Sequence, residues 1–74
     1  MNEYEIIIVG WNPGFNKVQT SKLFRTELGD NIADSKRRVD RIMRNETVVI
    51  STGSPQQLER MQNSLIDLGA KIQE

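Results

Sequence analysis

Basic side chains gather in residues 17–44, at spacings that place them together on helix surfaces. Lys17, Lys22 and Arg25 lie at i, i+5 and i+8, so on one helix they fall within about 140° of arc. Such a surface steers and orients an anionic partner. Val18 lies close to this stripe and is expected to add an apolar contact. These four residues form the first part of a predicted protein-binding site.

A second basic group continues the same segment. Eight Lys and Arg against four Asp and Glu give residues 17–44 a charge of +4, and the rest of the chain carries −4, so the formal total of zero is a cancellation. Lys36, Arg37 and Arg41 complete the predicted binding surface, with Arg44 beyond them. The alternative is that these bases simply pair with neighbouring aspartates along the helices.

The composition argues against catalysis. The chain has no His and no Cys, which removes the commonest general base, thiolate chemistry and the usual zinc ligands. Asp30, Asp34 and Asp40 lack the ligand spacing of a calcium loop, and Gly10 to Gly14 is too short for a phosphate-binding loop. No catalytic residue, cofactor or metal is therefore expected.

The apolar runs are short. The longest, from Ile6 to Val9, is far below the ~20 residues of a membrane span. With 36% apolar and 27% charged residues the chain is in the globular range, and its 74 residues have material for a single core. We expect one domain over residues 1–74, no membrane contact and a cytoplasmic location.

The first part of the chain predicts a strand, a turn and a helix. The β-branched run Tyr4 to Val9, closed by Gly10, predicts a central strand. Asn12-Pro13-Gly14 predicts a tight turn. A helix is then predicted from Lys17 to Leu28, with Val18, Leu23, Phe24 and Leu28 at helical spacing, Asn16 as its N-cap and Gly29 at its end.

A second helix follows, capped by Asp30 or Asn31. Its predicted apolar face consists of Ile32, Ser35, Val39, Ile42 and Met43. Thr47 to Ser51 predicts a short strand, and Ser54-Pro55 starts a third helix that carries Leu58, Met61, Leu65 and Leu68 and stops at Gly69. Ala70 to Gln73 predicts a final edge strand.

The order β-α-α-β-α-β supplies one sheet and enough helix to cover one of its faces. The predicted fold class is therefore α+β, a two-layer sandwich with a three-stranded, mainly antiparallel sheet and three helices on one face.

Trp11 and Phe15 flank the predicted turn. An exposed aromatic pair beside a basic helix could stack on the bases of single-stranded RNA. The alternative, which we favour, is that Phe15 covers the start of the first helix and Trp11 packs over the sheet edge.

The basic segment resembles a known family. Over 24 residues without a gap it is similar to the C-terminal domain of the bacterial ribosomal stalk protein, the one called seven/twelve. The end of the chain, Leu65 followed by Gly69-Ala70 and Ile72, looks like the last helix and strand of that domain. The matching central positions are Lys17, Val18, Lys22, Arg25, Gly29, Ile32, Asp34, Lys36, Val39 and Asp40.

The resemblance implies a small α+β domain that binds translational GTPases, namely initiation, elongation and release factors, and so takes part in translation at the ribosome. It places Lys17, Val18, Lys22, Arg25 and Lys36 on the contacting surface. This chain has Thr20 and Ser21 where the family has branched apolar residues, which removes part of the expected apolar contact. Only Met1 to Glu3 precede the first strand, so we expect a stand-alone relative without the dimerisation domain and hinge of a stalk protein.

Three other interpretations stay open at this point. The same basic face could bind RNA. The first strand, loop and helix also faintly resemble the substrate-binding adaptor of the Clp protease. The uncovered sheet face could associate weakly with a second copy, because strand one is apolar on both sides, so the chain is expected to be a monomer or a weak homodimer.

Overall fold

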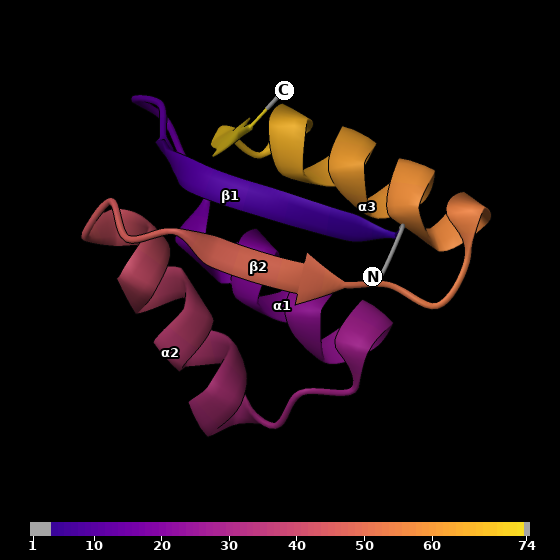
Figure 1. Ribbon diagram of the computed structural model, residues 1–74. Coiled ribbons are helices and arrows are strands. Elements are labelled where there is room, and N and C mark those ends of the chain that lie inside the picture. Colours follow the sequence, from indigo (N-terminus) through magenta and orange to yellow (C-terminus); the bar gives the residue numbers. More distant parts are fainter. Residues whose placement is uncertain (1–3, 74) are drawn as a thin grey trace.

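The computed structural model describes residues 4–73 and confirms the predicted α+β architecture. The three strands form one antiparallel sheet of order β2-β1-β3, with all three helices on one of its faces (Figure 1). Among the described residues, no helix has the length and apolarity to cross a membrane. The elements are β1 (Glu5–Trp11), α1 (Lys17–Leu28), α2 (Ile32–Met43), β2 (Val48–Ser51), α3 (Pro55–Asp67) and β3 (Ala70–Ile72).

The register of the sheet separates a buried face from an open one. Ile6 pairs with Ile50 and Ile8 with Val48, and all four side chains are buried under the helices. The alternate positions face away from the helices, where Val9 is 39% and Val49 47% exposed. Successive side chains along these antiparallel strands therefore alternate between the buried face and the exposed face of the sheet. Self-association through this open face stays a prediction.

A bulge in β1 extends the strand past the predicted end at Gly10. The register between β1 and β3 shifts between Ile8 and Gly10, after which Trp11 lies opposite Ala70. The extra residue changes which face of the sheet the following side chains point to, so that Trp11 points toward the helices. There its indole Nε1 donates to the backbone oxygen of Met43 at 3.1 Å. Trp11 and Phe15 are partly buried and both pack against the core, which agrees with the packing alternative.

The helix ends follow from side-chain caps, as the sequence predicted. Asn16 accepts from the backbone nitrogen of Gln19 at 3.0 Å, and α1 ends at Gly29 with φ 71°. Of the two candidates for the cap of α2, Asn31 takes the position, accepting from the backbone nitrogen of Asp34 at 2.7 Å. Capping of this kind satisfies amide groups that have no partner within the helix.

Two apolar residues of the helices, Val18 and Ile32, lie outside the core. Ile32 is 72% exposed, so the prediction that it belongs to the inner face of α2 is wrong, whereas Val18, at 74% exposed, is accessible as its place on the predicted binding surface requires. In α1 the fully buried positions are Phe24 and Thr20, and the Thr20 hydroxyl donates to the backbone oxygen of Asn16 at 2.7 Å. That bond within the helix satisfies the hydroxyl and makes its burial inexpensive. The buried apolar core consists of Ile6, Ile8, Phe24, Val39, Ile42, Val48, Ile50, Met61, Leu65 and Ala70.

A polar contact joins the end of α1 to α3. The Nε and Nη2 atoms of Arg60 donate to the two carboxylate oxygens of Glu27 at 3.0 and 2.7 Å, and the side chain of Gln57 donates to the Glu27 backbone oxygen at 2.8 Å. The hydrogen bonds from Arg60 lower the pKa of Glu27 below its ordinary value of 4.5.

This contact predicts a pH-dependent stability. A carboxyl whose pKa is lowered by folding stabilises the protein above its unfolded pKa, and the stabilisation is lost as the pH falls through the folded pKa. We expect Glu27→Gln to lower the free energy of unfolding at about pH 7, and the difference from wild type to shrink at about pH 3. Urea unfolding at both pH values tests this, with Glu59→Gln on the exposed face of α3 as the control. An equal loss at both pH values would contradict it.

Candidate functional site

A groove runs between α1 and α2 on the side that carries the basic segment. It has a volume of about 410 Å³ and is hereafter called the α1–α2 groove. Four of the seven predicted binding residues line it, and these are Lys17, Val18, Arg25 and Lys36. The remaining lining residues are Ser21, Ile32, Val39 and Asp40.

The apolar part of the groove comes from three branched side chains. Val18 and Ile32 are mostly exposed, whereas Val39 is only 4% exposed. Ile32 was expected in the core, because it shares a helical angle with Val39. Ile32 is the first residue of α2, and at this end of the helix the side that carries Ile32 lines the groove. Exposed apolar side chains within a polar surface are typical of binding sites.

Three cations border this apolar part. Within residues 4–73, Lys17, Arg25 and Lys36 form no ion pair. Asp40 also lines the groove, and no basic nitrogen lies within ion-pair distance of it in the same described range. The groove therefore offers positive charge that the described part of the protein does not neutralise by ion pairing.

Arg25 is anchored by hydroxyl groups. Its Nη1 donates to the Ser21 hydroxyl at 3.0 Å and, less closely, to the Ser35 hydroxyl at 3.4 Å. Ser21 donates in turn to Ser35 at 2.9 Å, and Ser35 donates to the backbone oxygen of Ile32 at 3.0 Å. The position of Ser35 inside the helix pair agrees with the sequence prediction, since this residue is fully buried.

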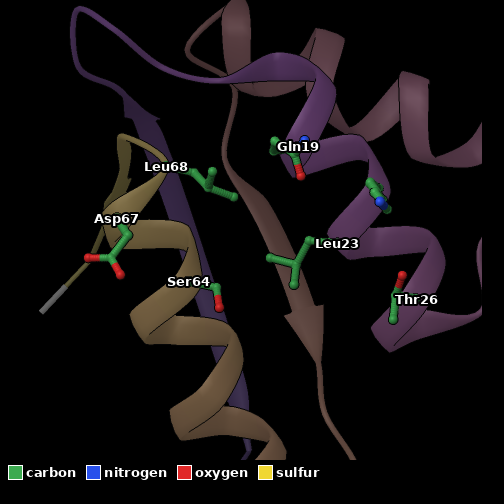
Figure 2. A pocket seen from close by; sticks show the side chains of 7 residues that line it. Gln19, Leu23, Thr26, Ser64, Asp67 and Leu68 are labelled. Atoms are coloured by element: carbon green, nitrogen blue, oxygen red, sulfur yellow. The ribbon is translucent and has the colours of Figure 1, made fainter.

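Lys22 lies outside the α1–α2 groove. It lines a separate hollow of about 350 Å³ between α1 and α3, with Asp67 and Leu68 among the residues of the opposite wall (Figure 2). The basic residues of α1 therefore line two different hollows: Lys17 and Arg25 line the α1–α2 groove, and Lys22 lines the hollow next to α3. Gln19, Leu23, Thr26 and Ser64 complete the lining.

Arg37 and Arg41 also lie apart from the groove. With Asp34 and Arg38 they line a small hollow of about 180 Å³. Arg37 pairs with Asp34 at 3.0 Å, and Arg41 pairs with Glu46 at 3.5 Å. For these two predicted binding residues, pairing with neighbouring acids is therefore what the structure shows.

Glu46 gathers two of the arginines at the end of α2. Arg44 donates to it at 2.7 Å, and this hydrogen bond lowers the pKa of Glu46 below its ordinary value, with the charges of Arg44 and Arg41 adding to the effect. Arg38 is paired as well, with Asp30 at 2.6 Å, and its guanidinium lies over the Phe24 ring at 6.0 Å. Charge and spacing along the sequence do not separate these paired arginines from Lys17, Arg25 and Lys36, which form no ion pair within residues 4–73.

Comparison with known proteins returned no match. No protein-family model, no curated protein and no solved structure matches this chain.

Proposed function

We propose that this protein is a non-catalytic protein-binding module whose α1–α2 groove binds an acidic surface of a translational GTPase. The observation that supports this most is the combination, around one groove, of two exposed branched side chains and three cations that form no ion pair with any described residue. The family resemblance of residues 17–40 supplies the class of partner.

The chemistry of the groove suits a charged partner with a small apolar contact. Lys17, Arg25 and Lys36 steer an acidic surface toward the groove and orient it, while Val18 and Ile32 offer apolar area that loses water on binding. The interface is small, so we expect fast exchange and a dissociation constant of about 1–100 μM.

The groove lacks the arrangement of a nucleophilic site. Among the described residues that line it, Ser21 carries the one hydroxyl, and this hydroxyl donates to Ser35 and accepts from Arg25. A serine nucleophile needs a base within hydrogen-bond reach to remove its proton. Binding is therefore better supported than catalysis.

An NMR titration with a bacterial elongation factor GTPase tests the proposal. We expect amide shifts centred on Lys17, Val18, Ile32 and Lys36, and weaker binding as salt increases, because exposed charges are screened. The open face of the sheet, at Val9 and Val49, is the internal control and is expected to stay unperturbed. Absence of binding at low salt, or shifts confined to the sheet face, would contradict the proposal.

RNA binding is the alternative, and it has less support. Phosphate contacts need available cations, and acids pair with the three arginines of α2 and with Arg44 at its end, which leaves fewer cations for phosphates. Trp11 and Phe15 pack against the core. A titration with single-stranded RNA separates the two, since nucleic-acid binding falls steeply and linearly on a log-log plot against salt.

A further inference from the structure

We propose that Ser21 and Ser35 position Arg25 so that the free edge of its guanidinium binds a carboxylate of the partner in a two-point contact. The proposal rests on the protein-binding function proposed above for the α1–α2 groove, and it names the chemical group that the groove selects. Ser21 and Ser35 are positioning residues, and Arg25 is the residue that contacts the partner.

The hydrogen bonds around Arg25 run in one direction. Arg25 Nη1 donates to Ser21, Ser21 donates to Ser35, and Ser35 donates to the backbone oxygen of Ile32. Each serine hydroxyl has a single proton, and both protons are used inside the protein. The two hydroxyls can therefore offer Arg25 only acceptor lone pairs, which hold the Nη1 side of the guanidinium against the helix pair.

The opposite edge of Arg25 is left available. Its Nε and Nη2 atoms make no hydrogen bond to any residue in the described range. The same two atoms of Arg38 bind Asp30, and the same two atoms of Arg60 bind Glu27, each on both carboxylate oxygens. This protein thus uses the Nε–Nη2 edge twice for carboxylates, and in Arg25 that edge is oriented, charged and unoccupied by any described residue.

The surroundings favour a carboxylate that stands beside an apolar side chain. Lys17 and Lys36 add positive charge to the groove, and Val18 and Ile32 are exposed within it. A planar guanidinium recognises the two oxygens of a carboxylate by geometry as well as by charge, which a lysine ammonium does not. The matching partner element is a glutamate or aspartate next to an aliphatic residue.

The test uses a minimal probe. N-acetyl-leucyl-glutamate amide is titrated into the full chain, and the Nε–H resonance of Arg25 is followed by NMR. N-acetyl-leucyl-glutamine amide, in which an uncharged amide of the same shape replaces the carboxylate, is the matched control. We expect the glutamate probe to shift this resonance and the glutamine probe to bind about tenfold more weakly, because the amide has no negative charge and only one acceptor oxygen for the guanidinium. Equal responses to the two probes overturn the proposal.

Variants separate positioning from charge. Arg25→Lys keeps the charge but removes the planar edge, and we expect it to lose the preference for the glutamate probe. Ser21→Val removes the hydroxyl and is expected to reduce the Arg25 response severalfold, whereas Ser21→Thr restores the hydroxyl and the response. A Ser21→Val protein that responds like wild type shows that the serines do not position Arg25. The comparison of the two probes on wild type holds even if Ser21→Val does not fold.

Failure of this proposal is distinguishable from failure of the proposed function. Binding of the elongation factor without a glutamate-specific response at Arg25 leaves the module function intact and rejects the two-point contact. A glutamate-specific response without binding of the elongation factor retains the contact and rejects that partner.

Discussion

Replacing Lys17 and Arg25 together with glutamate is expected to weaken binding of an elongation factor by about 100-fold or more, while the fold stays intact. The two substitutions remove two cations that have no ion pair within residues 4–73 and place two repulsive charges in the α1–α2 groove. Each lost charge-assisted contact costs about 1.5–3 kcal/mol, and like charges facing each other add to this. Calorimetric titration measures the affinity, and circular dichroism checks the fold.

The matched control reverses the same number of charges outside the groove. Arg37→Glu with Arg41→Glu changes the net charge equally, but these residues line a different hollow and are paired with Asp34 and Glu46. We expect this protein to bind within a few-fold of wild type after correction for long-range charge. If both double variants lose binding equally, the partner recognises overall charge and the groove has no special role. Lys22→Glu, in the hollow between α1 and α3, tests the remaining predicted residue.

Gly69→Ala is expected to destabilise the fold by about 3 kcal/mol, the largest effect that we predict for a single methyl group. Gly69 has φ 98°, and a Cβ there would lie 2.9 Å from the Cα of Phe15 and 3.3 Å from its backbone nitrogen. The neighbouring backbone cannot move away cheaply, because Asn12 donates to the Gly69 oxygen at 2.8 Å and Asn16 donates to the Leu68 oxygen at 2.9 Å. The clash therefore adds to the cost of a positive φ.

Gly29→Ala is the control for this clash. Gly29 also follows a helix with a positive φ of 71°, but a Cβ there meets nothing within 4 Å. We expect a loss of about 1–2 kcal/mol from the backbone conformation alone. Urea unfolding measures both, against a total of about 4–11 kcal/mol for a domain of this size. Equal losses for the two variants would show that the approach of Phe15 to Gly69 does not matter for stability.

The local elements were predictable because their signals lie within a few residues. The helix from Lys17 to Leu28 was predicted to the residue, since its cap Asn16 and its terminal Gly29 act on adjacent backbone groups. Ser54 followed by Pro55 likewise predicted the first residue of α3. The strand end was not predictable, because the bulge that carries Trp11 into β1 depends on pairing with β3, some sixty residues along the chain.

The candidate site was only partly predictable for a related reason. Charge and spacing found Lys17, Val18, Arg25 and Lys36, which the groove brings together. They missed Ile32, because its position around the helix matches that of the buried residues of α2. They also grouped Lys22 with the groove residues, although Lys22 lies on the other side of α1. Ion pairs such as that of Arg41 with Glu46 join residues of different segments and have no signature in spacing along one helix.

By itself, the sequence determined which segments form helices and strands, that one sheet face is covered, and that positive charge is concentrated on the first two helices. Only the tertiary structure decided which of those charges is available. Caps and periodicity act between near neighbours in the chain, so the sequence displays them directly. The docking of α1 on α2, with Ser21 bonded to Ser35 beneath the Arg25 guanidinium, results from side chains fourteen residues apart packing together. In the part of the chain that the structure describes, that packing left three cations without an ion pair around one groove, whereas the arginines of α2 are paired with acids.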